Sequence, residues 1–124
     1  MTIGDIAERF EIGGVRFELV DFFKPNEMFI EGTVMLKRAK IVGAIINDET
    51  AQRLLLNRHR IPKELREFDV VLAGPVRRID GRGIGRGMKF ISYIHYRGGL
   101  WVEGLGGVRY DWSPKARLVR ESDF

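Results

Sequence analysis

The sequence predicts an α+β fold in which short N-terminal helices precede an antiparallel, hairpin-linked sheet, with a partly open barrel as one form that this sheet could take. Three observations lead to this fold class. Apolar residues follow helical spacing in segments before residue 68, they alternate with polar residues after Asp69, and glycine pairs separate the alternating segments. The 124 residues, 44% of them hydrophobic, suffice for one core, so residues 1–124 are expected to form a single domain.

The first expected helix runs from Thr2 to Phe10. Thr2 can cap its start, and four apolar residues follow the spacing i, i+3, i+4 and i+7: Ile3, Ile6, Ala7 and Phe10. The glycines at 13–14 would end this helix. The following residues, 15–19, alternate between apolar and charged side chains, which predicts a half-buried strand.

Residues 28–46 are open to two interpretations. Phe29 and Ile30 could continue a strand, whereas a helical stripe is formed by Met35, Ala39, Val42 and Ile46. The stripe favours a helix from about Thr33 to Gly43, with its basic residues pointing away from the core: Lys37, Arg38 and Lys40.

A second helix is expected to begin at Asn47 or Asp48. Its cap and its first acidic residues suit a helix start, and a buried stripe is formed by Ala51, Leu54 and Leu55. Pro62 would end this helix and open a short turn over residues 63–68.

After Asp69 the pattern predicts strands over residues 70–74 and 88–96 and a tight hairpin at 97–99 before a strand from Leu100. A second turn is expected at Gly106 and Gly107. The segment around Leu118 is expected to form a final edge strand.

The charge of the chain is concentrated between Val76 and Lys89. Five of the 21 Lys and Arg residues and one of the 17 Asp and Glu residues lie there, which leaves 16 of each sign elsewhere and accounts for the net charge of +4. Glycines alternate with basic residues in this segment, so backbone N–H groups and guanidinium groups could both face an anion. The predicted polyanion-binding residues are Arg77, Arg78, Arg82, Arg86 and Lys89.

Two more specific nucleotide sites are excluded by the spacing of residues 81–87. A dinucleotide-binding motif would need a third glycine where Met88 stands and a helix after it, and a P-loop would need Gly-Lys followed by Ser or Thr. Two interpretations remain. The segment is either a basic hairpin tip that binds polyanions or a solvent-exposed tip whose arginines only keep it soluble.

Aromatic residues near this segment are candidates for stacking on bases. Tyr93 would share one strand face with Lys89 and His95, and Trp101 follows in the next strand. The alternative is that both aromatic rings belong to the core.

No catalytic or metal-binding pattern accompanies the basic segment. Cysteine is absent, and His59 and His95 lack partners at metal-binding spacing, so no cofactor and no enzymatic activity are expected. A pocket joining His95 to a carboxylate would instead indicate catalysis. The absence of a long apolar segment and of a secretory signal predicts a cytoplasmic protein without a membrane partner.

The segment from Asn57 to Arg78 combines Ile61-Pro62, an apolar strand and Gly74-Pro75, and the chain later carries Trp101 and the ending Arg117-Leu-Val-Arg120. This arrangement resembles short, uncharacterised bacterial and phage-type proteins of unknown function. The resemblance implies an accessory protein in a bacterial or mobile-element setting and supplies no active-site residue.

The sequence therefore predicts a small non-enzymatic binding module whose partner is nucleic acid or an acidic protein surface. The alternative is a protein–protein adaptor or inhibitor that pairs through an edge strand near Leu118. A homo-oligomer formed through apolar strand faces is a third arrangement to test.

Overall fold

The computed structural model describes residues 3–78 and 88–122 of the chain. The described residues form two α-helices, two short 3₁₀ helices and eight strands. In chain order these elements are β1 (Ile6–Ile12), β2 (Val15–Val20), β3 (Ile30–Glu31), α1 (Gly32–Ile41), α2 (Asp48–Leu56), η1 (Arg58–Arg60), η2 (Lys63–Leu65), β4 (Asp69–Arg78), β5 (Lys89–Arg97), β6 (Leu100–Gly107), β7 (Asp111–Trp112) and β8 (Ala116–Glu121).

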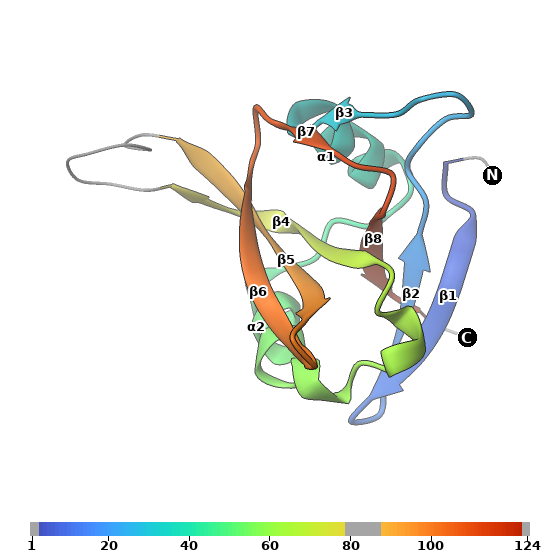
Figure 1. Ribbon diagram of the computed structural model, residues 1–124, viewed down its shortest axis with the longest axis vertical. Helices are drawn as coiled ribbons and strands as arrows, with labels where there is room; N and C mark the ends of the chain where they lie inside the picture. Colours follow the sequence, from blue (N-terminus) through green and yellow to red (C-terminus); the bar gives the residue numbers. More distant parts are fainter. Residues whose placement is uncertain (1–2, 79–87, 123–124) are drawn as a thin grey trace.

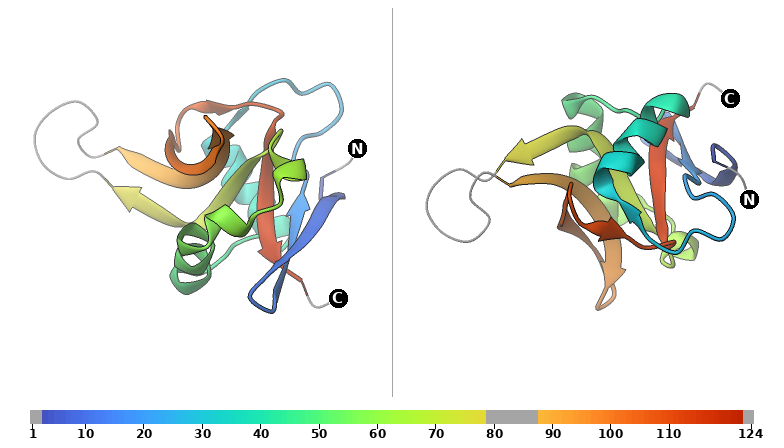
Figure 2. Two further views of the ribbon diagram at one scale, coloured as in Figure 1. Left: turned by 60° about the horizontal axis from the view of Figure 1, so that its bottom comes forward. Right: turned by 90° about the horizontal axis from the view of Figure 1, so that it is seen from above.

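Six of these strands form one open sheet in the order β1-β2-β8-β4-β5-β6, and β3 pairs with β7 in a separate two-stranded sheet (Figures 1 and 2). All pairings are antiparallel except that of β4 with β8. The α+β class is confirmed. The predicted order is wrong, because a β-hairpin precedes both α-helices, and the six-stranded sheet is not closed into a barrel.

Residues 6–10 of the segment predicted as the first helix belong instead to strand β1. Its partner is β2, and the two-residue loop between Ile12 and Val15 consists of Gly13 and Gly14, both with positive φ. Such a glycine pair favours a tight hairpin turn. Phe10 then stacks on a ring of β2 and becomes part of the core, so long-range pairing outweighs the helical spacing of the first ten residues.

Both faces of the sheet are covered. Val70 and Leu72 point into a core with α2, whereas Val71 and Ala73 point into a second core with α1. Burial on both faces explains why residues 70–73 are continuously apolar. The predicted helix over 33–43 is confirmed as α1, and the predicted helix at 48 is confirmed as α2.

Strand β8 lies inside the sheet, between β2 and β4. The prediction of an edge strand near Leu118 is therefore wrong, and Leu118 is fully buried. A parallel neighbour cannot be recognised from a local hairpin signal, because the chain between parallel strands is long.

The turn expected at Gly106 and Gly107 lies instead at residues 108–110, and both glycines belong to β6. A Cβ atom at Gly106 would collide with the ring of Trp112, and one at Gly107 would collide with Tyr110. Gly106 makes room for the ring of Trp112 in the second core, and Gly107 makes room for the exposed ring of Tyr110, a role that glycine also has in strands.

Candidate functional site

Strands β4 and β5 extend together beyond the other strands of the sheet (Figures 1 and 2). Their ends carry the basic segment of residues 76–89, which we call the basic arm. In the described part of the arm Arg77 stands opposite Phe90, and Arg78 stands opposite Lys89. The side chain of Lys89 is exposed. Arg82 and Arg86 lie outside the described residues.

The register brings two basic positions directly opposite each other. Opposed positions in an antiparallel pair have Cβ atoms about 5 Å apart, and like charges there disfavour the pairing. Arg78 and Lys89 occupy such positions.

A large bulge in β4 forms the base of the arm. Val71 pairs with Tyr93 and Val76 pairs with Ile91, so residues 72–75 of β4 all stand opposite Ser92. The bulge is held against the loop before α2, because the Ile46 N–H donates to the Ala73 carbonyl oxygen at 2.8 Å.

The N-terminal end of α2 lies beside this bulge. Asn47 caps the helix by accepting a hydrogen bond from the Thr50 N–H at 2.8 Å, as expected from the sequence. Asp48 and Glu49 occupy the first turn, where carboxylates complement the helix dipole. Ala51 faces the core.

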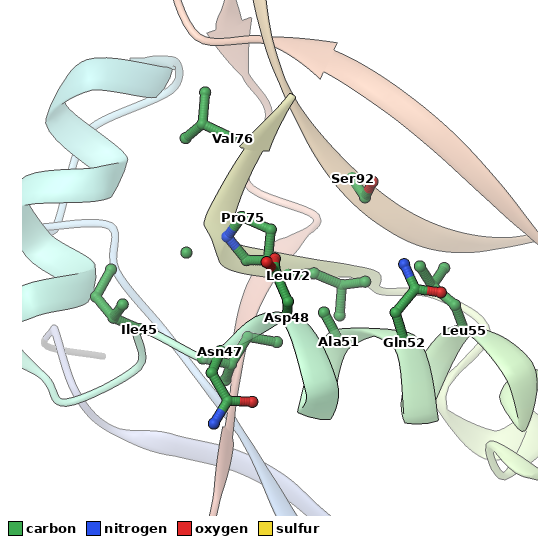
Figure 3. Close-up of a pocket in the computed structure, with 12 residues that line it drawn as sticks. Ile45, Asn47, Asp48, Ala51, Gln52, Leu55, Leu72, Pro75, Val76 and Ser92 are labelled. Atoms are coloured by element: carbon green, nitrogen blue, oxygen red, sulfur yellow. The ribbon is translucent and has the colours of Figure 1, made fainter. Parts of the chain in front are cut away.

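Between α2 and the β4 bulge there is a groove of about 870 Å³, which we call the α2–β4 groove. Its twelve lining residues are Ile45, Ile46, Asn47, Asp48, Ala51, Gln52, Leu55, Leu72, Gly74, Pro75, Val76 and Ser92. Asp48 and Gln52 point from the helix toward β4 and β5, whereas the Asn47 side chain points away (Figure 3). The groove therefore has an apolar floor and polar groups on the helix side.

Ser92 contributes a hydroxyl group on the strand side of the groove. Its Oγ donates a hydrogen bond to Glu103 Oε2 on β6 at 2.9 Å, and Ser92 is buried. Because the hydroxyl proton is used in this bond, the Ser92 oxygen can offer a ligand only its lone pairs.

Two arginines outside the arm are held by carboxylates. Arg38 makes two hydrogen bonds to Glu27, at 2.6 and 2.9 Å, so its guanidinium is paired with a carboxylate. The guanidinium of Arg38, followed by the Lys24 backbone N–H, lowers the pKa of Glu27 to about 2. Arg120 contacts Glu18 at 2.8 Å.

The basic residues around α2 are also partly neutralised. Arg53 lies 3.6 Å from Glu49, one helical turn earlier. Arg58 donates to the carbonyl oxygens of Leu55 and Trp101, at 2.6 and 3.1 Å. These contacts favour local pairing over an extension of the basic surface from the arm.

The two stacking candidates lie in different environments. Trp101 is buried, its indole N–H donates to the Ile61 carbonyl oxygen at 3.0 Å, and its ring packs against Tyr96. Trp101 therefore offers no free face. Tyr93 is partly buried, and its ring packs on the edge of Trp112 and over Gly104.

His95 lies next to Tyr93, with the two ring centroids 5.2 Å apart. Burial raises the pKa of the Asp69 carboxyl, and the smaller influences of His95 and Lys115 act to lower it. Neither His95 nor Asp69 lines the α2–β4 groove. No metal-binding cluster of His, Asp and Glu is found within residues 3–78 and 88–122.

The described helices are all too short or too polar to cross a membrane. No family model, curated protein or solved structure matches this chain. The resemblance to bacterial and phage-type proteins therefore remains an expectation from the sequence.

Proposed function

We propose that this chain is a non-enzymatic binding module that presents the basic arm to nucleic acid. The observation that carries the proposal is the location of the excess charge: the whole net charge of +4 is in residues 76–89, on the extension of one strand pair. Phosphate groups accept charge-assisted hydrogen bonds from guanidinium and ammonium groups, and a nucleic-acid strand presents them in a regular series.

The arrangement of the described residues supports this choice over a purely solvated tip. Arg78 and Lys89 stand opposite each other, although an alternation of charge would stabilise the strand pair better. Elsewhere, Arg38, Arg53 and Arg120 lie against carboxylates. Outside residues 76–89 the 16 basic and 16 acidic residues balance, so the surplus of basic residues lies within that segment.

In this function Arg82 and Arg86 contact phosphate groups, and Arg77, Arg78 and Lys89 supply the surrounding positive potential. Tyr93 is the remaining candidate for stacking on a base. With three to five phosphates neutralised, the logarithm of the association constant should fall with the logarithm of salt concentration at a slope of about −3 to −4.5.

The test is a fluorescence-anisotropy titration of single- and double-stranded oligonucleotides at two salt concentrations. The Arg82→Ala/Arg86→Ala variant should bind more weakly and show a salt slope smaller by about 2. A matched control is Lys37→Ala/Arg60→Ala, which removes the same charge from exposed residues of α1 and η1. Equal binding by the two double variants would refute the proposal.

An acidic protein surface is the alternative partner. The strand of this chain near Leu118, expected to pair with such a partner, lies inside the sheet. A protein partner would therefore have to bind the basic arm instead. A salt-resistant protein complex together with no affinity for oligonucleotides would favour this alternative.

A further inference from the structure

We infer that a second cleft, between the β5–β6 hairpin and the two 3₁₀ helices, binds a small organic anion with an apolar body, such as an aliphatic carboxylate. We call it the hairpin cleft. Its volume is about 400 Å³, and its nine lining residues are Leu56, Arg58, His59, Lys63, Tyr96, Gly99, Leu100, Trp101 and Val102. The inference goes beyond the proposed function and does not depend on it, because the cleft contains no residue of the basic arm.

The hairpin cleft lies at the end of β5 that is opposite the basic arm. Strand β5 begins at Lys89 and ends at Arg97, where Gly98 and Gly99 turn the chain into β6. Helix η1 packs against β6 beside this turn (Figure 1). The cleft therefore combines residues 56–63 with residues 96–102, and a ligand in it would be remote from the arm.

Two apolar side chains of the cleft are unusually exposed. Leu56 is 73% exposed and Leu100 is 67% exposed. Single exposed leucines are common on protein surfaces, but these two border the same cleft. The less exposed apolar lining residues are Tyr96, Trp101 and Val102. A ligand with an apolar chain or ring would remove the two leucines from water, which favours binding.

The charged side chains of the cleft are all basic. None of the nine lining residues, all within the described part of the chain, is Asp or Glu. Arg58 and Lys63 are cations, and the ring of His59 adds an N–H donor. Within residues 3–78 and 88–122, none of these three side chains forms an ion pair with a carboxylate. The cleft therefore favours a ligand with negative charge, in contrast to the α2–β4 groove with Asp48.

Arg58 is held in place by bonds that leave donors for a ligand. Its Nε donates to the Trp101 carbonyl oxygen at 3.1 Å, and its Nη1 donates to the Leu55 carbonyl oxygen at 2.6 Å. These bonds fix the guanidinium between the end of α2 and β6, but a carbonyl group carries no formal charge that would balance it. A guanidinium has five N–H groups, so most of them remain for an anion. Carboxylates accept such hydrogen bonds in pairs.

The size of the hairpin cleft limits the ligand. A volume of about 400 Å³ lies toward the lower end of the range for small-molecule sites, which are mostly apolar with a few polar groups that fix orientation. The apolar surface alone would accept many compounds, and the basic groups restrict the choice. The two features together favour an anionic headgroup near Arg58 and Lys63 with an apolar body near Leu56 and Leu100.

The experiment compares octanoate, octanol and octylamine, which share an alkyl chain and differ in headgroup. Binding is followed by the NMR signals of the Trp101 indole N–H and the Leu100 backbone amide. Octanoate should bind about ten-fold more tightly than octanol, as one charge-assisted hydrogen bond predicts, and octylamine should bind most weakly. Equal affinities for octanoate and octanol would overturn the recognition of an anion.

Charge variants locate the headgroup. Arg58→Gln should reduce the preference for octanoate over octanol to less than about two-fold. Lys63→Gln is an exposed change that should preserve the fold, and it should weaken octanoate binding about three-fold without affecting octanol. Arg66→Gln removes the same charge from an exposed residue just after η2 and outside the cleft, so it serves as the control. Equal effects of Lys63→Gln and Arg66→Gln would refute binding of the headgroup in this cleft.

Apolar variants locate the alkyl chain. Leu100→Ser should weaken the binding of octanoate and octanol alike, whereas Leu105→Ser changes an exposed leucine of the same strand outside the cleft and should leave both unchanged. Equal effects of the two variants would overturn the assignment of the chain to this cleft. If the signals of Leu56 and Leu100 instead change with protein concentration in the absence of ligand, a second copy of the chain covers the cleft and the inference is wrong.

Discussion

The backbone of Gly74 lies directly against the carbonyl oxygen of Ile46, in a space too small for any side chain. Gly74 has a φ of +138°, and the neighbouring Ala73 carbonyl accepts the hydrogen bond from Ile46 N–H. This contact joins the β4 bulge to the loop that leads into α2. It therefore sets the distance between the two sides of the α2–β4 groove.

We predict that Gly74→Ala destabilises the fold by about 2–4 kcal/mol, because the new Cβ would displace the Ile46 carbonyl and the residue would keep an unfavourable φ. Urea denaturation measures the loss. Gly99→Ala is the matched control, since Gly99 also has a positive φ but has open space around it. Equal decreases in the free energy of unfolding of the two variants would show that the contact with Ile46 does not contribute to stability.

We predict that acid removes a stabilising contribution of Glu27. Its folded pKa of about 2 lies below the ordinary value of 4.5, so the contribution is complete above about 4.5 and is lost as the pH falls toward about 2. Glu27→Gln should therefore be less stable than the wild type near neutral pH, and this difference should shrink across that pH interval.

Thermal unfolding as a function of pH measures the Glu27 effect. Glu49→Gln serves as the control, because its ion pair with Arg53 is exposed and such pairs contribute about 0.5 kcal/mol or less. The assigned pKa would be contradicted if the stability difference between Glu27→Gln and the wild type stayed constant as the pH falls from about 4.5 to about 2.

A third prediction concerns the partly buried pair of Glu18 and Arg120. Burial acts to raise the pKa of Glu18, but hydrogen bonds from Ser122 and Arg120 and the charge of Arg120 outweigh it, so the pKa is lowered. Arg120→Met should cost about 3 kcal/mol near neutral pH, because it leaves a buried carboxylate with fewer partners.

The pH dependence of Arg120→Met gives a check on its cause. Without the hydrogen bond and the charge of Arg120, the Glu18 pKa should lie higher than in the wild type, although Ser122 and Arg9 still act to lower it, so protonation in acid should relieve part of the loss. The Glu18→Met/Arg120→Met double variant should be more stable than Arg120→Met alone. Denaturation at several pH values tests both, and a double variant less stable than the single one would exclude an uncompensated charge as the cause.

The sequence predicted the elements that are specified locally. The cap at Asn47 and the glycines at 98–99 identify α2 and the β5–β6 hairpin without knowledge of the rest of the chain. The prediction of a first helix was wrong because the Gly13-Gly14 pair was interpreted as a helix end rather than as a hairpin turn. The interior position of β8 depends on a parallel pairing between segments distant in sequence.

The candidate site was predicted only in part. Charge clustering identified the arm, but the groove depends on the bulge that brings β4 next to α2, and no charge pattern marks it. Gly74-Pro75 within an apolar strand was the available signal, since both residues favour bulges in strands. Asp48 and Gln52 fit an ordinary helix start, and Ser92, which lines the same groove, comes from a strand that is distant in sequence.

The final prediction separates structure from binding at Trp101. Trp101→Phe should lower the stability by about 1–3 kcal/mol, because the Ile61 carbonyl loses its hydrogen-bond donor and the packing against Tyr96 is reduced. Its affinity for oligonucleotides should stay at the wild-type value, since Trp101 is only 6% exposed. Urea denaturation and anisotropy are measured on the same sample, and Tyr93→Leu provides the comparison at the partly exposed ring. If the Trp101→Phe protein is folded but binds oligonucleotides more weakly than the wild type, Trp101 contributes directly to nucleic-acid binding and this prediction is wrong.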